Sequence, residues 1–537
     1  MSLGYDFYTK DATSGLARGA VEPPSIGGGS TWTKKAFRSY LKTISARQEG
    51  EAIDYHVRLE GDDEGVYDTH EIIAGPDGMI YFTQQKHDRV GRLRTDGQVE
   101  YLIMPEGSGP HGIQFSSTKR LFVTFEFTDE IAEINPKDGS ILNRFNIGFD
   151  NFSTDGVVGP HGLAIDKADQ LWYTGKSSDT LGRLDPTSGE HTRFTLETRA
   201  EFAPYFEHGI DPKASGPIYI KFDHSGNAWF VNLLSNEIGK IDTNDAISLY
   251  KITGFETDNT RPINVFEGPD KNIWVTIEGE KLDPSTGSTA ELGGIARFDP
   301  TSGTFLNSYQ QYRSKGAGGT AGTDGRSVWF QYQEESLVEL TINKDGRLFE
   351  TTYDLPDIGQ RVMHRVTKGP DRNIWFTSLM EDTVGVLTTD EQAIPTYSFF
   401  DKKEQRQYLS ALPDEITYLQ SKPSRYENQT GVFLSSTRNK QSTPTSRFKD
   451  KLTGNTYWSI DKDDIRSMKN SKRFDYEGKD FRVFADAYSV NDLVPVFEAR
   501  DLSTGASTWS TDASSFEDRD LFSKSHIAWY AHPFEAT

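Results

Sequence analysis

The chain has no cysteine, so disulfide bonds and thiol chemistry are both excluded. Hydrophobic residues make up only 35% of its 537 residues, and no apolar run is long enough to span a bilayer. Basic residues number 58 against 80 acidic ones, which gives a formal net charge of −22. Because nucleic acids and anionic membranes attract basic surfaces, we expect neither of them as a partner.

What the sequence does contain is a repeat centred on an aromatic residue. The clearest copies read GPDGMIYFT, GPDKNIWVT and GPDRNIWFT. The aligned aromatics are separated by 41, 50, 57, 45, 55 and 46 residues: Tyr81, Phe122, Trp172, Trp229, Trp274, Trp329 and Trp375. A period of this size suits four short strands, and the period-two alternation with Gly and Asp turns indicates strands instead of helices. The repeat predicts an all-β fold, a seven-bladed β-propeller over residues 51–400.

Two other regions flank the repeats. Residues 1–50 include a Pro/Gly/Ser-rich stretch and are expected to form a lead-in segment. The strand that closes the ring could be 54–59 or 394–400, and the sequence does not choose between them. Residues 401–537 form a smaller C-terminal domain with an internal duplication, in which Trp458 aligns with Trp509. This region resembles the repeat modules at the C-termini of secreted microbial enzymes, and its aromatics could either bind carbohydrate or form a core.

Four of the eleven histidines occupy the same position of the repeat. The residue eleven places before each aromatic should face the central channel, and in four repeats it is histidine: His70, His111, His161 and His364. Chance would place fewer than one histidine in seven such positions. Neutral imidazole binds divalent metal ions and is also a good base near neutral pH. We therefore expect the four to form a metal site on adjacent blades, with His70 and His111 as candidates for the catalytic base.

Charged and polar neighbours complete the predicted site. Asp68 lies two residues before His70, on the same face of the predicted strand, where its carboxylate could orient the imidazole. Asp68 and Arg361 are catalytic candidates beside His70 and His111, and the guanidinium of Arg361 could stabilise a developing oxyanion. Arg365 and Lys221 are further cations that could meet a substrate carboxylate. The predicted substrate-binding residues are Gln84, Gln85, Tyr205, His208, Lys221 and Arg261.

Several of these segments point to a known family. GPHGI (109–113), GPHGL (159–163), the GPD-x-x-IWFT strands and LGRLD (181–185) resemble the seven-bladed virginiamycin B lyases, or streptogramin lyases, over about residues 65–390. The resemblance implies ring opening by elimination, with a histidine in a Glu-x-His-Gly context as the general base and acidic residues holding Mg²⁺. The nearest match to that context is Asp68-Thr69-His70.

The chain departs from the family pattern around the expected metal. The recurrent glutamate of the family's WFTE segments is replaced by Gln84, Gly175, Asn232 and Ser378, and two histidines become four. This pattern favours a nitrogen-rich site for a transition metal over an oxygen-rich Mg²⁺ site. The expected cofactor is a divalent ion, with Mn, Zn, Ca, Mg and Fe all open.

Three functions fit this sequence. The first is a carbon–oxygen lyase acting by β-elimination on a uronate-containing glycan or a cyclic depsipeptide ester, as streptogramin lyases and several propeller-shaped polysaccharide lyases do. The second is a four-histidine metal oxygenase-type propeller, and the third is a binding propeller without activity. We expect the first, with a small molecule or an oligosaccharide as substrate and a monomeric protein. The accessory module and the sequons at Asn151 and Asn428 favour an extracellular location, and a cytoplasmic one stays open.

Overall fold

The computed structural model describes most of the chain from Gly50 to Pro533. The described residues are 50–59, 62, 66–95, 97, 99–148, 158–196, 215–255, 259–282, 289–291, 293–310, 318–322, 324–332, 336–343, 346–358, 361–389, 392–403, 406–410, 419, 422–436, 442–485, 493–503, 506–518 and 520–533. The expected lead-in segment, apart from Gly50, and the predicted site residues Tyr205 and His208 lie outside these ranges.

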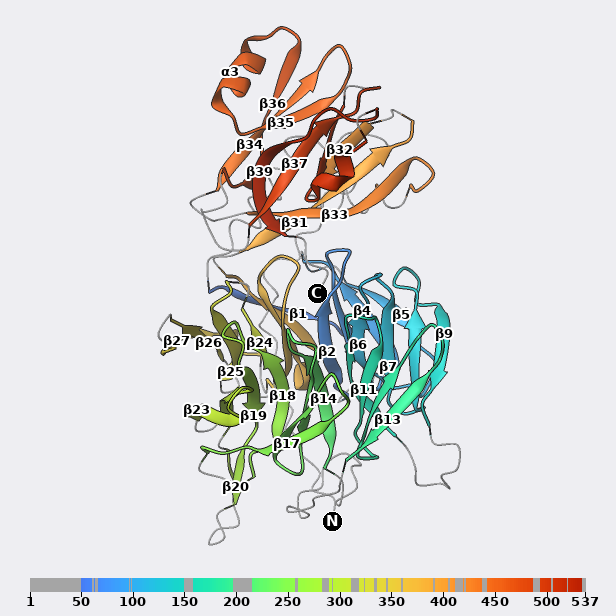
Figure 1. Ribbon diagram of the computed structural model, residues 1–537, viewed down its shortest axis with the longest axis vertical. Coiled ribbons are helices and arrows are strands. Elements are labelled where there is room, and N and C mark those ends of the chain that lie inside the picture. The colour runs from blue at the N-terminus through green and yellow to red at the C-terminus, as the bar shows by residue number, and fades with distance from the viewer. Residues whose placement is uncertain are drawn as a thin grey trace.

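Seven four-stranded antiparallel sheets surround a common axis, and the first strand of each sheet lies next to the first strand of its neighbours (Figure 1). Blade 1 comprises β2 (Thr69–Ala74), β3 (Ile80–Gln84), β4 (Arg89–Leu93) and β5 (Val99–Ile103); blade 2 comprises β6 (Pro110–Phe115), β7 (Leu121–Phe125), β8 (Glu130–Ile134) and β9 (Ile141–Asn146); and blade 3 comprises β10 (Pro160–Ile165), β11 (Leu171–Gly175), β12 (Thr180–Leu184) and β13 (His191–Thr195). Blade 4 comprises β14 (Pro217–Phe222), β15 (Ala228–Asn232), β16 (Glu237–Ile241) and β17 (Ile247–Lys251), and blade 5 comprises β18 (Pro262–Glu267), β19 (Ile273–Ile277), β22 (Gly294–Asp299) and β23 (Thr304–Gln310). Blade 6 comprises β24 (Gly319–Ala321), β25 (Ser327–Tyr332), β26 (Ser336–Ile342) and β27 (Leu348–Asp354), and blade 7 comprises β28 (Met363–Lys368), β29 (Ile374–Ser378), β30 (Thr383–Leu387) and β1 (Ala52–His56). A short hairpin of β20 (Glu280–Leu282) and β21 (Thr289–Glu291) extends from blade 5, and the 3₁₀ turn η1 (Leu379–Glu381) lies in blade 7. The predicted propeller is confirmed.

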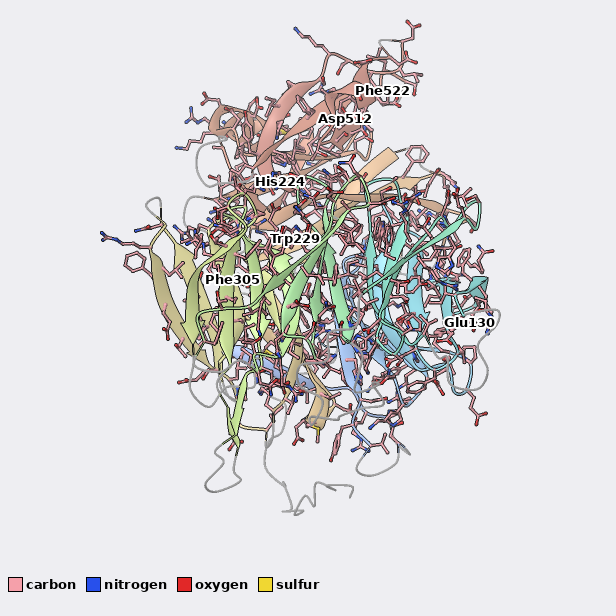
Figure 2. All side chains as sticks on the ribbon, turned by 60° about the horizontal axis from the view of Figure 1, so that its bottom comes forward. Glu130, His224, Trp229, Phe305, Asp512 and Phe522 are labelled. Carbon is pink, nitrogen blue, oxygen red and sulfur yellow. The ribbon has the colours of Figure 1, made fainter. Side chains whose placement is uncertain are left out.

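The turn that precedes each repeat aromatic explains why the motif reads Gly-Pro-Asp. The indole N–H of Trp375 donates to the carboxylate of Asp371 at 2.8 Å, and that of Trp274 donates to Asp270 at 3.0 Å. Trp229, labelled in Figure 2, makes the same bond to Asp223 at 2.9 Å. A buried indole needs a hydrogen-bond acceptor, so the aspartate lets a large aromatic side chain enter the core without losing a hydrogen bond.

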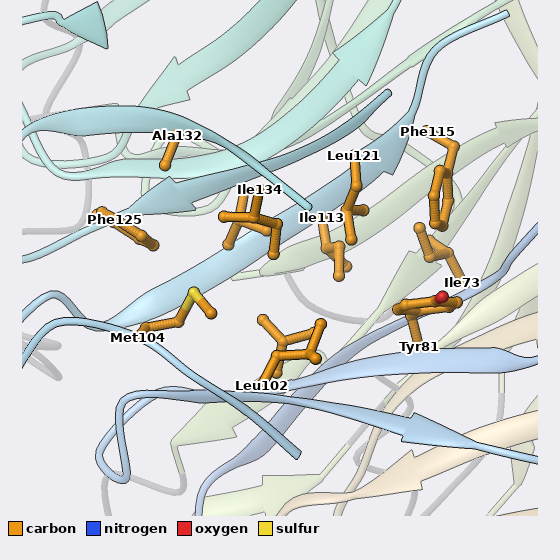
Figure 3. Close-up of a cluster of buried hydrophobic side chains, with 12 residues drawn as sticks. Ile73, Tyr81, Leu102, Met104, Ile113, Phe115, Leu121, Phe125, Ala132 and Ile134 are labelled. Carbon is orange, nitrogen blue, oxygen red and sulfur yellow. The ribbon is translucent and has the colours of Figure 1, made fainter. Parts of the chain in front are cut away.

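Apolar side chains fill the space between neighbouring blades. Between blades 1 and 2, Tyr81 and Leu102 pack against Ile113, Leu121 and Ile134 (Figure 3). Each sheet therefore buries both faces only when it has a neighbour on each side. This arrangement concentrates the chain's limited hydrophobic content between blades and leaves the channel to polar residues.

A second, polar contact joins one blade to the next. In five blades, an Asp or Asn at positive φ in the turn between the second and third strands accepts a hydrogen bond from the backbone N–H at the start of the following blade. The pairs are Asp88 with Gly109, Asp129 with Gly159, Asp179 with Ser215, Asn236 with Arg261, and Asp382 with Asp68. Asp and Asn tolerate the left-handed backbone better than other non-glycine residues do, which accounts for their recurrence at this turn.

The ring closes through an N-terminal strand. β1 pairs with β30, so the last blade combines the two ends of the propeller. Arg361 makes two hydrogen bonds of 2.8 Å to Asp54 in β1, and both side chains are buried. Of the two closures that the sequence left open, residues 54–59 are therefore the correct region. The rival segment 394–400 belongs to a strand of the C-terminal domain, so the boundary lies between Leu387 and Ala393 and not at 400.

The C-terminal domain is a separate antiparallel β-structure. It contains β31 (Ala393–Asp401), β32 (Arg406–Ser410), β33 (Tyr426–Ser436), β34 (Thr443–Asp450), β35 (Thr456–Ser459), α3 (Lys462–Asn470), β36 (Phe474–Val483), β37 (Val494–Arg500), β38 (Ser507–Ser510), η2 (Ala513–Phe516) and β39 (His526–Pro533). The sequence duplication appears as two matching three-stranded units, β36–β34–β35 and β39–β37–β38. Trp458 and Trp509 are both buried with ring centroids 5.3 Å apart. Core packing is thus the role of these aligned aromatics.

This domain lies at one end of the propeller (Figure 1). The N–H of Ala393 donates to the carbonyl of Asp371, in the turn that ends β28. The four predicted histidines lie at the start of the inner strands, whereas this contact is made beyond the end of β28. In the part of the chain that the structure describes, none of the helices has the length and apolarity needed to cross a membrane.

Replacing Arg361 by Met should destabilise the propeller by about 3–5 kcal/mol, because it leaves the buried Asp54 carboxylate without a partner. Scanning calorimetry would measure this as a fall in the unfolding midpoint. Arg144→Met is the matched control, since its pair with Glu130 is exposed and should be worth less than about 1 kcal/mol. An Arg361→Met protein with unchanged stability would contradict a structural role for this residue.

Candidate metal centre

The four predicted histidines meet in the channel. Each is the second residue of an inner strand: His70 of β2, His111 of β6, His161 of β10 and His364 of β28. The ring centroids of His70 and His111 are 4.9 Å apart, those of His70 and His364 are 4.9 Å apart, and those of His111 and His161 are 3.7 Å apart. His111 and His161 are buried, and the other two are partly buried. The structure therefore brings all four imidazoles together.

A β-bulge lies at the histidine in each of these four strands. The pairing register shifts between Thr69 and Ile72 in blade 1, and the same shift recurs across His111, His161 and His364. A bulge breaks the alternation of side chains between the two faces of a strand. The residue after the histidine can then also face the channel, which is how Glu71 and Arg365 reach the site.

Threonine hydroxyls of the aromatic strands hold these bulges. The hydroxyl of Thr83 accepts a hydrogen bond from the N–H of Glu71 at 3.1 Å and donates one to the carbonyl of His111 at 2.9 Å. Thr124 joins Gly112 to His161 in the same way, and Thr377 joins Arg365 to His70. Each hydroxyl therefore links the bulge of one blade to the histidine of the next.

Steric crowding explains why the last residue of each Gly-Pro-His-Gly segment is glycine. A Cβ atom on Gly112 would lie 2.5 Å from the carbonyl oxygen of His161, and one on Gly162 would lie 2.8 Å from the carbonyl oxygen of Ile218. Both distances are too short for any side chain. Glycine at these positions allows neighbouring inner strands to approach closely.

Backbone carbonyls orient three of the imidazoles. His111 Nδ1 lies 3.2 Å from the carbonyl of His161, His161 Nδ1 lies 2.7 Å from that of Ile218, and His70 Nδ1 lies 2.6 Å from that of Asp68. A carbonyl only accepts hydrogen bonds, so each Nδ1 must carry the proton, and each Nε2 keeps its lone pair. His364 Nε2 has no hydrogen-bond partner among the described residues. This is the orientation in which second-sphere carbonyls prepare histidines for a metal ion.

Burial keeps the imidazoles neutral. It lowers the pKa of His70 to about 3, and it lowers the pKa values of His111, His161 and His364 well below the usual range. The positive charges of Lys176 and Arg365 act in the same direction on the pKa of each ring. Neutral imidazole is the form that binds metals, so no proton needs to leave before an ion enters.

Two overlapping groups of side chains have ligand atoms close enough to hold an ion. In one, the ligand atoms of His70, His111 and His364 lie within 4.8 Å of one another; in the other, those of His111, His161 and Glu126 do. Imidazole suits Zn, Fe, Ni or Cu, whereas Mg²⁺ and Ca²⁺ prefer oxygen. The donor set therefore fits a transition metal and does not fit an oxygen-rich Mg²⁺ site.

Asp68 and Gln84 contact structural partners. The Asp68 carboxylate accepts hydrogen bonds from the N–H groups of Lys86 and His87 and lies 2.8 Å from His87 Nδ1, so only its backbone carbonyl contacts His70. Gln84 donates to Thr69 and accepts from Arg89. Arg361 is held by Asp54, as described above. These three side chains are thus directed away from the imidazoles.

The remaining predicted residues that the structure describes have partners of different kinds. Gln85 donates to the Glu126 carboxylate at 2.6 Å, and Lys176 donates to its other oxygen at 3.1 Å. Lys221 lies deeper in the channel, beside Tyr219. Arg261 pairs with Glu278 at 3.0 Å. A substrate-binding role for Gln85, Lys221 and Arg261 stays a prediction.

Sequence reasoning missed two carboxylates of the site. Glu71 lies 2.7 Å from Arg365, 3.7 Å from His364 and 4.0 Å from His111. Its position next to His70 was a signal, but regular strand alternation directs adjacent residues to opposite faces. Glu126 comes one residue after the position of the family's WFTE glutamate, and it was therefore overlooked.

The chain is similar to a known family over part of its length and to several solved structures. Residues 67–286, less than half of the chain, match the Virginiamycin B lyase family. A streptogramin B lyase structure is 18% identical over 63% of this chain and 97% of its own, with a TM-score of 0.48. A catalytically inactive histidine-to-alanine variant of virginiamycin B lyase from Staphylococcus aureus, with quinupristin, is 19% identical over 63% and 99%, with a TM-score of 0.48.

The similar solved structures are not limited to lyases. Hydrazine synthase from Kuenenia stuttgartiensis is 12% identical over 62% of this chain and 98% of its own, with a TM-score of 0.46. No curated protein matched the chain. In its repeat motifs and in the matched residues 67–286, this chain resembles the virginiamycin B lyase family.

Proposed function

We propose that this protein is a metal-dependent carbon–oxygen lyase. It would remove a proton from the carbon next to a carboxylate or carbonyl group, and an oxygen leaving group in the β position, an alkoxide or a carboxylate, would depart. One observation carries the proposal, namely the three-histidine group of His70, His111 and His364 with a fourth oriented imidazole, His161, beside it. This arrangement offers both a site for a Lewis acid and a separate proton acceptor.

His70, His111 and His364 would hold the ion, because their ligand atoms form one group and their rings are neutral. A divalent ion bound there would act as a Lewis acid, stabilising negative charge on the oxygen of an enolate. The carbonyls that accept from His70 and His111 Nδ1 fix the two rings, so little reorganisation is needed when the ion binds.

His161 is the imidazole that remains to accept a proton. Its Nδ1 donates to the carbonyl of Ile218, which leaves the Nε2 lone pair as the base. Its ligand atom lies within 4.8 Å of the Glu126 carboxylate, which would stabilise the imidazolium after proton transfer. Gln85 and Lys176 hold that carboxylate in place. The carbon–hydrogen and carbon–oxygen bonds break, a carbon–carbon double bond forms, and the alkoxide takes up a proton.

Two substrate classes offer this chemistry. A uronate-containing glycan has an acidic hydrogen next to its carboxylate and an ether oxygen in the β position. A cyclic depsipeptide with an ester oxygen in the β position to a carbonyl has the same acidic hydrogen, and there the leaving group is the carboxylate of the ester. In both, the transition state carries an enolate-like charge that the ion would stabilise.

A four-histidine redox centre is the second candidate. The observation that favours it is that the His161 ring centroid lies 3.7 Å from the ring centroid of His111, so a fourth imidazole adjoins the three-histidine group that could hold an iron or copper ion. Oxygen consumption without formation of an unsaturated product would identify this alternative.

Full-length protein should bind about one transition-metal ion per chain. His111→Ala should lower that affinity at least about 100-fold, because His111 belongs to both groups of ligands. Elemental analysis after dialysis against a limiting metal buffer would measure the loss, with His224→Ala, an exposed histidine paired with Glu267, as the control. Equal metal content in the two variants would contradict the site, provided both unfold at the wild-type temperature.

The His161→Ala variant should show whether His161 acts as the proton acceptor or as a metal ligand. The variant should keep its ion but lose at least about 100-fold in the rate of unsaturated-product formation, because general base catalysis contributes roughly that much. The assay follows ultraviolet absorbance after mixing with acidic polysaccharides or a cyclic depsipeptide. Loss of the ion together with activity would make His161 a ligand instead of the base.

A further inference from the structure

We propose that Arg365 and Lys221 form a seat for a carboxylate group of the substrate, just beyond the four histidines along the channel. This inference deepens the proposed function by specifying an anionic substrate, and it rests on that function for its catalytic meaning. The binding of a carboxylate to these two cations can nevertheless be measured without turnover.

Arg365 crosses the channel from blade 7 to blade 4. Its guanidinium carbon lies 4.4 Å from the ring centroid of Tyr219, on β14 of the opposite side. Its Nη1 donates to the carbonyl of His364 at 3.0 Å, and its Nε lies 2.7 Å from Glu71. Only 2% of the side chain is exposed, and its Nη2 has no hydrogen-bond partner among the described residues. A buried guanidinium nitrogen of this kind calls for an acceptor.

Lys221 approaches the same place from blade 4. It lies two residues after Tyr219 on β14 and so shares its face of the strand, and its Nζ is 5.7 Å from the Tyr219 ring centroid. Among the described residues, no carboxylate lies within ion-pair distance of this ammonium group. Two cations thus lie close to the Tyr219 ring, Arg365 from blade 7 and Lys221 from blade 4.

The charges in this part of the channel do not balance. Arg365 and Lys221 contribute two positive charges, and Glu71 contributes one negative charge. Glu71 pairs with Arg365, and Glu126 pairs with Lys176. Lys221 is therefore the cation in this part of the channel that has no carboxylate partner among the described residues. A buried charge without a partner is costly, so an anion entering here would be strongly favoured.

A carboxylate fits this seat better than a spherical anion does. The Nη2 group of Arg365 can donate to one oxygen of a carboxylate, and the Lys221 ammonium can bind the other oxygen. Arg365 directly follows His364, so a carboxylate bound there would place its neighbouring carbon beside the imidazoles. Neutralising that carboxylate would also make the adjacent hydrogen more acidic. The seat therefore favours a uronate or another carboxylic acid over a neutral ester.

Isothermal titration of full-length, metal-depleted protein with D-galacturonate tests the seat. The methyl ester of galacturonate is the neutral probe of nearly equal shape, and metal depletion removes binding to the ion. We expect galacturonate to bind and its ester to bind at least about tenfold more weakly. Lys221→Met and Arg365→Gln should each weaken galacturonate binding at least about tenfold, whereas Lys240→Met, a loss of one lysine on the outer side of the same blade, should not.

Three outcomes would overturn the seat: no galacturonate binding, equal binding of the acid and its ester, or wild-type binding by folded Lys221→Met. Lys221 contacts none of the histidines, so this variant remains informative even if Arg365→Gln fails to fold. Galacturonate binding that depends on Lys221, without elimination of any acidic substrate, would instead leave the seat standing and contradict the lyase.

Discussion

The imidazole cluster depends on one irregularity, the β-bulge at the start of the inner strands. A regular strand would send alternate residues to the channel, so His70 and Glu71 could not both face it. The bulge turns both inward, and the hydroxyl of Thr83 fixes it by bonding to Glu71 and to the carbonyl of His111. That hydroxyl comes from the aromatic strand, which is itself part of the inter-blade core. The position of the candidate site is thus tied to the packing of the ring.

Desolvation then determines the chemistry of the site. Burial disfavours imidazolium, so the rings are neutral and their Nε2 atoms are free to bind an ion. The same burial makes each fixed charge more influential, because there is little water to screen it. Arg365 and Lys221 therefore act on the channel more strongly than an equal number of surface charges would, even in a chain with an excess of acidic residues.

Much of this could be predicted from the sequence. The spacing of the aromatics gave seven blades, because inter-blade packing requires a large side chain at one position of each repeat. Counting back from the aromatics identified the four histidines, because the number of residues between the channel-facing position and the core aromatic is the same in these repeats. The duplication in the C-terminal domain was also visible, and its aligned tryptophans, Trp458 and Trp509, form part of a core.

Side-chain direction near the bulges could not be predicted. Strand alternation placed Asp68 beside His70, whereas its carboxylate binds the turn at His87. The same alternation concealed Glu71. Arg361 was expected to stabilise a developing oxyanion, but it pairs with Asp54, which is distant in the sequence. Such pairings depend on how the ring closes, and the sequence left two closures open.

The central claim is that the imidazoles bind a transition ion through nitrogen. X-ray absorption spectroscopy of the full-length protein loaded with one equivalent of Zn²⁺ tests this most directly. Our account predicts about three or four nitrogen neighbours at roughly 2.0–2.1 Å, with the outer-shell scattering of histidine rings. A spectrum with only oxygen neighbours, or with no more than one imidazole, would contradict it.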